Sequence, residues 1–237
     1  WRLDDVVALI RGPKDTLVRL ELIPTGKGPD ANSKIIRITR DKIKLEEQAA
    51  KMSIIEIKRR EQPVRIGVIQ IPTFYIDFEG RSRGDSDYRS TTRDTRKLID
   101  ELKSSNVDGL VIDLRGNGGG ALTEAISLSG LFISSGPIIQ IRNHRGRIRP
   151  RNDPDKDIAY NGPLAVLVDR ESASASEILA GAIQDYRRGL IIGEPTFGKG
   201  TVQNLIDLDR FSEDDSPVGQ LKITTAQFFR IDGNSTQ

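Results

Sequence analysis

Residues 109–121 read GLVIDLRGNGGGA, a short apolar run followed by four glycines within five positions. A continuous apolar run of this length bounded by glycine is typical of a strand buried on both faces. The glycines allow a tight turn after the strand, and they let several backbone N–H groups converge on one point. The stretch therefore predicts a buried strand, a glycine loop and a helix over 121–132 in succession.

Strand and helix patterns continue on both sides of this stretch. We predict strands over 64–71, 138–142, 164–169 and 189–193, helices over 95–104 and 175–186, and renewed alternation from Thr201 onward. The polar stretch 77–93 is expected to be a mobile loop. Strands that alternate with helices across short loops favour parallel pairing, so the predicted fold class is α/β (α+β), with βαβ units and a mixed sheet.

The composition of the 237 residues excludes several kinds of chemistry. There is no cysteine, which excludes a disulfide scaffold, a thiol nucleophile and Cys-ligated metal sites. With a single histidine, His144, in an arginine-rich stretch that reads as a solvated hairpin, we expect an enzyme of this sequence to use another base. A net charge of +2 gives no reason to expect a nucleic acid or an anionic membrane as partner. No apolar run reaches the roughly 18 residues of a membrane span.

The glycine loop itself has three interpretations. Gly116-x-Gly118-x-x-Ala121 matches the dinucleotide-binding pattern, but the next predicted strand does not end in the acidic residue that would hold the ribose. Converging N–H groups also suit an oxyanion. A tight turn without further function is the third interpretation.

A second glycine loop, GEPTFGKGT over 193–201, is one residue away from a phosphate-binding loop. Gly200 stands where a magnesium-binding hydroxyl is required, and the following residues look extended rather than helical. Lys199 is therefore either a solvated loop residue or a group with another function.

A serine cluster, SASASE over 172–177, stands between a predicted strand and a predicted helix. Ser174 and Glu177 form a capping box, which is a sufficient structural reason for both. A hydroxyl at such a turn also lies beside free helix N–H donors, as a nucleophile requires. The spacing does not decide between the two interpretations, nor among the three serines.

Taken together, DLRGNGGG (113–120), SASASEILA (172–180) and GEPTFGKGTVQ (193–203) closely resemble the tail-specific proteases, or carboxyl-terminal processing peptidases. The match runs almost end to end and is strongest with the periplasmic enzymes of Gram-negative bacteria. The resemblance implies serine endopeptidases with a Ser–Lys dyad and a PDZ domain that captures the free C-terminus of the substrate. It implies the C-terminal part of a PDZ domain at 1–40, a linker at 41–62 and the protease core at 63–237.

Site residues follow from the resemblance position by position. It implies Ser174 as nucleophile, Lys199 as general base and Gln203 as the polar residue that orients the lysine. A lysine accepts a proton only when neutral, which requires surroundings that disfavour the ammonium. We expect Pro195 and Phe197, which we also assign to substrate binding, to form an apolar wall with the helix at 178–182.

The resemblance also implies an oxyanion hole. One donor is the N–H of Ala175, and the other comes from the last glycines of the first loop, with Gly120 preferred to Gly119. Asn117 and Arg115 are expected to support this loop.

The expected partners are protein or peptide substrates with free, apolar C-termini, together with membrane-associated targets or adaptor proteins of the full-length enzyme. No cofactor, metal or nucleic acid is expected. The family implies a periplasmic location, and we expect its carboxylate-binding loop to lie upstream of Trp1 and a further strand beyond Gln237. The alternatives are a dinucleotide- or nucleotide-binding protein and an inactive PDZ-linked binding module.

Overall fold

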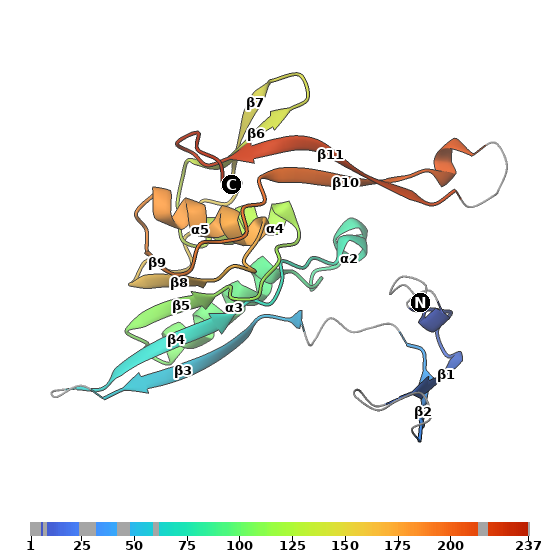
Figure 1. Ribbon diagram of the computed structural model, residues 1–237. Coiled ribbons are helices and arrows are strands. Elements are labelled where there is room, and N and C mark those ends of the chain that lie inside the picture. Colours follow the sequence, from blue (N-terminus) through green and yellow to red (C-terminus); the bar gives the residue numbers. More distant parts are fainter. Residues whose placement is uncertain are drawn as a thin grey trace. The chain divides into compact units, whose positions relative to one another are not determined.

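The structure is a computed structural model that describes residues Val6, 9–23, 32–41, 48–58, 62–212 and 218–236. The chain divides into two compact units, residues 1–47 and 48–237. In the first unit, β1 (Leu17–Leu22) pairs antiparallel with β2 (Lys34–Thr39) (Figure 1).

The second unit is built on a five-stranded sheet in the order β3-β4-β5-β8-β9. Its strands are β3 (Lys51–Ile57), β4 (Val64–Gln70), β5 (Gly109–Asp113), β8 (Leu164–Val168) and β9 (Leu190–Gly193). β3 runs antiparallel to β4 and the remaining neighbours are parallel, which confirms the mixed α/β sheet. Because β3 pairs with β4 along its whole length, the second compact unit includes β3, which lies in the stretch expected to be a linker.

Three helices connect the parallel strands and form one layer. They are α3 (Thr91–Ser104), α4 (Leu122–Gly130) and α5 (Ala175–Asp185), with α4 packed between the other two. Apolar side chains from both layers are buried completely, among them Ile69, Ile112, Val166, Leu128 and Leu179. A short helix, α2 (Phe78–Arg83), occupies the stretch expected to be a loop, because Asp77 caps its first turn and Gly84 ends it at a φ of 78°.

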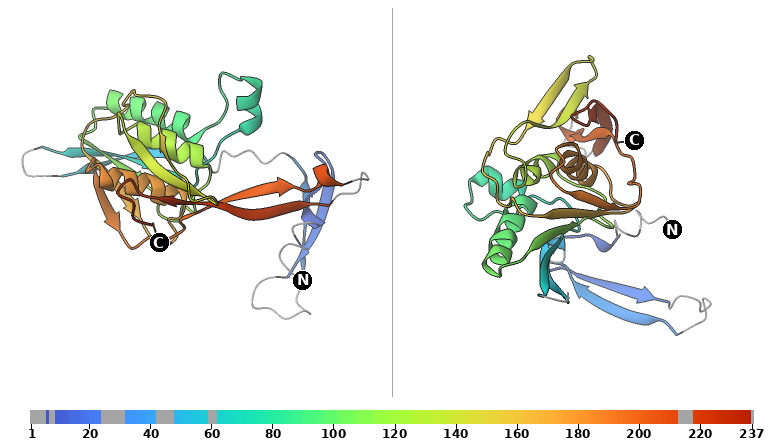
Figure 2. Two further views of the ribbon diagram at one scale, coloured as in Figure 1. Left: turned by 90° about the horizontal axis from the view of Figure 1, so that it is seen from above. Right: turned by 90° about the vertical axis from the view of Figure 1, so that its left-hand side faces the viewer.

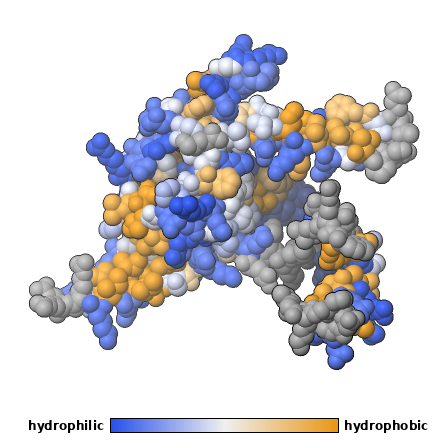
Figure 3. All heavy atoms as spheres, viewed as in Figure 1, coloured by the Kyte–Doolittle hydropathy of each residue, from blue (hydrophilic) through white to orange (hydrophobic). Residues whose placement is uncertain are grey.

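A second sheet has the order β10-β11-β6-β7 and is antiparallel throughout. Its strands are β6 (Pro137–Asn143), β7 (Ile148–Asn152), β10 (Thr201–Asp207) and β11 (Gln220–Phe229), and a 3-10 turn, η2 (Asp209–Phe211), follows β10. β10 and β11 continue beyond the sheet as a two-stranded ribbon (Figure 2). The ribbon carries apolar side chains on its surface (Figure 3). One of them, Leu205, is 66% exposed.

The sheet order positions the loops. β5 and β8 are parallel neighbours, so the glycine loop after β5 and the serine cluster after β8 leave the sheet at the same edge. Ligand sites of open α/β sheets form at this carboxyl edge. The fold therefore brings together two of the three sequence blocks that carry the family resemblance.

Arg188, in the turn between α5 and β9, joins three segments of the second unit. Its guanidinium donates to the carbonyl oxygens of Phe132 (3.1 Å), Gly162 (3.0 Å) and Tyr160 (2.8 Å). A planar group with several fixed donors suits such a convergence of carbonyls.

We predict that Arg188→Gln lowers the free energy of unfolding by about 2–4 kcal/mol, because up to three partly buried carbonyls lose their donors. The neighbouring Arg187 is exposed, and Arg187→Gln should cost no more than about 0.5 kcal/mol. Urea unfolding of both variants measures the difference, and equal losses would contradict the structural role of Arg188.

Candidate active site

Ser174 adopts a strained backbone conformation at the turn between β8 and α5. Its φ of 56° and ψ of −108° are unusual for a residue with a side chain. Such a conformation costs about 1–3 kcal/mol and is found mainly at functional sites. The residue stands directly before the first turn of α5, beside N–H groups that have no partner within the helix.

One buried carboxylate, that of Glu177, binds both the serine turn and the lysine loop. Its Oε2 accepts hydrogen bonds from the backbone N–H groups of Ser174 (2.7 Å) and Lys199 (2.9 Å). Its Oε1 accepts from the Thr196 hydroxyl (2.8 Å) and the Gly198 N–H (2.7 Å). The glutamate half of the predicted capping box is therefore present. Its second task, holding the lysine loop, was not foreseen, because it depends on a contact 22 residues away.

A cavity of about 540 Å³ brings the expected catalytic residues together. It is lined by Ser174, Lys199, Gln203, Gly120 and Ala175, and further by Phe78, Gly118, Ala121, Leu122, Ile178, Thr201, Val202, Asn204, Lys222 and Phe228. The side chain of Lys199 is partly buried, and its Nζ donates to the carbonyl oxygen of Thr201 at 3.1 Å. None of the residues that line the cavity is an aspartate or a glutamate.

Asn117 holds the glycine loop against the serine cluster. Its fully buried amide donates to the carbonyl of Ile71 (2.7 Å) and accepts from the N–H of Gly119 (2.8 Å). Its own carbonyl accepts from the Ala173 N–H (3.0 Å) and the Ser176 hydroxyl (2.9 Å). The N–H of Gly119 is thus already used within the loop, which argues against it as an oxyanion donor.

Gly120 and Ala175 both line the cavity, and their backbone N–H groups are the candidate oxyanion donors. Neither N–H has an acceptor among the described residues, whereas the neighbouring Gly119 carbonyl and Ala121 N–H both bond to the backbone of Phe74. Gly120 has a φ of 143°, and a Cβ there would lie 2.1 Å from the carbonyl oxygen of Phe74. Only glycine fits this position, because a side chain would collide with the Phe74 backbone.

Two aspartates stabilise the start of the glycine loop. Asp113 binds the guanidinium of Arg115 with both oxygens (2.9 and 2.7 Å), and this hydrogen bonding lowers the pKa of Asp113. Asp169 accepts the N–H of Gly116 (2.9 Å), which is the main cause of its own lowered pKa. Asp169 also accepts the N–H of Ser172 (3.0 Å), so that it connects the two loops. Arg115 was expected to support the loop, whereas the two carboxylates were not foreseen.

Pro195 and Phe197 do not line this cavity, contrary to our expectation of an apolar wall there. Phe197 is 67% exposed and Pro195 is exposed as well. The backbone explains the difference, because the Phe197 N–H donates to the carbonyl of Ser172 (3.0 Å) and the ring is left outside. Apolar surface in the cavity comes instead from Leu122, Ile178, Val202, Phe228 and Phe78.

The competing interpretations of the loops lose support. A strand, β10, and not a helix follows the lysine loop, which removes the helix N-terminus that a phosphate-binding loop needs. His144 lies exposed between β6 and β7, away from the cavity. In the part of the chain that the structure describes, no group of histidine and acidic side chains could hold a metal ion, and no helix is long and apolar enough to cross a membrane.

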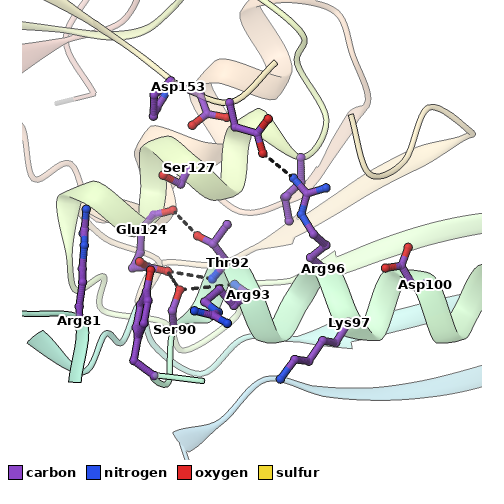
Figure 4. A pocket seen from close by; sticks show the side chains of 14 residues that line it. Arg81, Ser90, Thr92, Arg93, Arg96, Lys97, Asp100, Glu124, Ser127 and Asp153 are labelled. Atoms are coloured by element: carbon purple, nitrogen blue, oxygen red, sulfur yellow. Dashed lines mark hydrogen bonds and ion pairs between the residues drawn. The ribbon is translucent and has the colours of Figure 1, made fainter. Parts of the chain in front are cut away.

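A second cavity, of about 400 Å³, lies at the start of α3 (Figure 4). Its polar groups mostly bind one another. Glu124 accepts from the Ser90 hydroxyl (2.7 Å) and the Thr92 N–H (2.8 Å), and Arg96 pairs with Asp155 at 3.0 Å. These contacts secure the beginning of α3 and offer no pairing of a nucleophile with a base.

Comparison with known proteins relates the chain to a group of peptidases. A model of peptidase family S41 matches residues 65–237. The tail-specific protease of Haemophilus influenzae is 47% identical over 238 residues, covering 100% of this chain and 31% of that protein. The carboxy-terminal processing protease CtpA of Bacillus subtilis is 34% identical over 231 residues, covering 98% of this chain and 42% of that protein. The chain spans less than half the length of these two relatives.

The chain is also similar to a solved structure of a processing protease. The photosystem II D1 C-terminal processing protease superposes with a TM-score of 0.66 and 29% identity, over 99% of this chain and 56% of that chain. The similarity extends to a mature CPAF, for which the TM-score is 0.59 at 13% identity, a likeness of fold alone.

The glycine loop yields a test of the cavity. A Cβ at Gly119 would lie 2.9 Å from the Cβ of Ser174 and 2.8 Å from the Ala173 carbonyl, whereas a Cβ at Gly118 meets nothing within 4 Å. We predict that Gly119→Ala slows labelling of Ser174, the nucleophile expected from the sequence, by a fluorophosphonate probe about 10²-fold, because small displacements of a reacting group are costly. Gly118→Ala should be labelled at close to the parental rate. Equal rates for the two variants would contradict the packing described.

Proposed function

The chain belongs to peptidase family S41, and on that premise we propose that it is a serine endopeptidase that cleaves proteins selected by their C-terminal tails. The observation that supports this most is the single cavity that holds Ser174, Lys199 and the two open N–H groups of Gly120 and Ala175. A nucleophile, a base and an oxyanion hole are the three parts that acyl transfer needs.

In the proposed reaction, the Ser174 hydroxyl attacks the carbonyl carbon of the scissile peptide bond while neutral Lys199 takes its proton. The N–H groups of Gly120 and Ala175 stabilise the tetrahedral oxyanion. The lysine then passes the proton to the leaving amine, and an acyl-enzyme remains. Water, deprotonated by the same lysine, releases the acid and restores the serine.

Apolar side chains line the cavity that holds the proposed base. Ile178, Val202 and Phe228 contribute apolar surface to the cavity, and no carboxylate among the lining residues would pair with an ammonium. Gln203, which lines the same cavity, follows the lysine by four residues and has the role of orienting its amine.

We propose further that the substrates are proteins and peptides with free, apolar C-termini. The names of the relatives, tail-specific and C-terminal processing protease, support this selection for them. In this chain, residues 1–40, with the β1–β2 hairpin, would be the C-terminal part of the PDZ domain that captures the tail. A periplasmic location and recruitment of membrane-associated targets or adaptors belong to the same proposal.

The decisive experiment compares cleavage of an unfolded protein by the parent chain, Ser174→Ala and Lys199→Ala. Both variants should lose at least about 10³-fold in activity, because each removes an indispensable part of the dyad. Both should keep the parental circular dichroism and melting temperature. Lys156→Ala, a change of an exposed lysine outside the cavity, is the matched control.

Two results would count against the proposal. Undiminished cleavage by Ser174→Ala would exclude the serine mechanism. Stabilisation by NAD(P) or ATP, by about 2.7 kcal/mol at 100 times the dissociation constant, would instead favour the nucleotide-binding alternative.

Glu177 is expected to act as a positioning residue. Its four accepted hydrogen bonds hold Ser174 and Lys199 relative to each other. In a glutamine, an NH2 group replaces one of the two accepting oxygens and would face N–H or O–H groups that are themselves donors. We predict that Glu177→Gln lowers kcat by about 10- to 100-fold with little change in KM, because geometry and not substrate binding is affected.

The exposed Glu171 provides the matched control for this prediction, since the structure gives its side chain no role in the site. Glu171→Gln should keep the parental kcat. An unchanged kcat in Glu177→Gln would exclude the positioning role, whatever the effect on stability.

A further inference from the structure

A second lysine, Lys222, lines the cavity that holds Ser174 and Lys199. It belongs to β11, in the part that forms the ribbon with β10. The side chain is exposed, and its ammonium has no hydrogen bond or ion pair among the described residues. The proposed proton transfers use Lys199 and leave Lys222 without a role.

The register of the ribbon determines the side on which Lys222 lies. Gln203 pairs with Thr224, and Leu205 pairs with Lys222. Paired residues and residues two positions apart share a face of an antiparallel ribbon, so Lys222 and Gln203 are on the same face. They are diagonal neighbours, about 7–8 Å apart between their Cα atoms. The ribbon thus presents a cation beside the residue that would orient the base.

Among the described residues that line the cavity, no acidic side chain neutralises this cation. Lys199 is neutral in the proposed reaction, so Lys222 supplies the positive charge of the lining. A concave site lined by one sign of charge raises the local concentration of ligands with the opposite sign. The anions that a peptide offers are the side chains of aspartate and glutamate and the terminal carboxylate.

The position of Lys222 along the ribbon specifies where such an anion would lie. Leu205, opposite Lys222, follows Thr201 by four residues, and Thr201 is at the start of β10 beside the dyad. Extended chains advance about 3.3 Å per residue, which gives about 13 Å along the ribbon. Allowing for the reach of a lysine side chain, the matching group of an extended peptide is two to four residues from the scissile bond.

We infer that Lys222 is a specificity-determining residue that binds a carboxylate of the substrate two to four residues from the bond that is cleaved. The inference rests on the proposed function, because it needs a peptide in the cavity. The carboxylate belongs either to an acidic side chain or to the C-terminus of a short peptide, and both present the same chemistry to the ammonium.

The test uses fluorogenic peptides of one parent sequence, with Asp or Asn at each position two to four residues on either side of the scissile bond. A second set ends two to four residues after that bond, as free acid or as amide. The enzymes are the parent chain, Lys222→Gln, Lys222→Glu and the control Lys156→Gln. The first set reports an acidic side chain, and the second reports the terminal carboxylate.

We expect the parent and Lys156→Gln to prefer the carboxylate at one of these positions by about three- to tenfold in kcat/KM, the range of a partly screened ion pair. Lys222→Gln should lose the preference while cleaving the neutral peptides at the parental rate, and Lys222→Glu should reverse it. The preference should shrink as salt rises from about 0.05 to 0.5 M, because the interaction is electrostatic. An unchanged preference in Lys222→Gln would overturn the inference.

A binding measurement separates this outcome from failure of the proposed function. Ser174→Ala and the double variant Ser174→Ala/Lys222→Gln are titrated with the same labelled peptides by fluorescence anisotropy. Suppose that the parent cleaves nothing, and that Ser174→Ala binds the carboxylate peptides more tightly whereas the double variant does not. The peptidase proposal then fails and the binding role of Lys222 stands. If neither variant distinguishes carboxylate from amide at any position, the role of Lys222 is excluded.

Discussion

The carboxylate of Glu177 is the interaction on which the geometry of this site depends. It is only 3% exposed and is satisfied by four donors, three of them backbone N–H groups. Hydrogen bonds to a charged acceptor are about twice as strong as neutral ones, and low polarity around them increases their stiffness. The donors come from the Ser174 turn and from the Lys199 loop. One side chain therefore fixes the position of the strained serine turn relative to a loop that lies 22 residues or more along the chain.

The central sheet makes this contact possible. Parallel pairing of β5 with β8 brings the glycine loop and the serine turn to one edge, and Asn117 and Asp169 then fasten the two loops together. The lysine loop enters after β9, the next strand in the sheet. The second sheet supplies the remaining wall, since Gln203 and Lys222 reach the cavity from β10 and β11. The residues to which we assign a role thus lie in loops and turns at one edge of the first sheet, at the start of α5 and on two strands of the second sheet.

Much of this could be predicted from the sequence where the signal is local. The apolar run at 109–113 and its glycines predicted β5, the loop and α4, and the alternation of strands and helices predicted the mixed sheet. β3 was taken for part of a linker because the stretch 41–62 around it is rich in charge, and pairing with β4 is what includes it in the central sheet. Pro195 and Phe197 were expected in the cavity on the basis of their hydrophobicity, but hydrogen bonds of the loop backbone leave them outside.

The amino-acid sequence alone predicts which side chains are available for chemistry: no thiol, one histidine, and a serine and a lysine in loops that resemble those of a peptidase family. It also predicts the order of strands and helices, because apolar periodicity and glycine act over a few residues. The tertiary structure decided which N–H groups remain open: the Asn117 amide occupies that of Gly119, while those of Gly120 and Ala175 have no acceptor among the described residues. It also decided that Lys222 faces the cavity, through the register of β10 and β11. These features depend on contacts between residues that are far apart in the chain, and such contacts leave no periodic trace in the sequence.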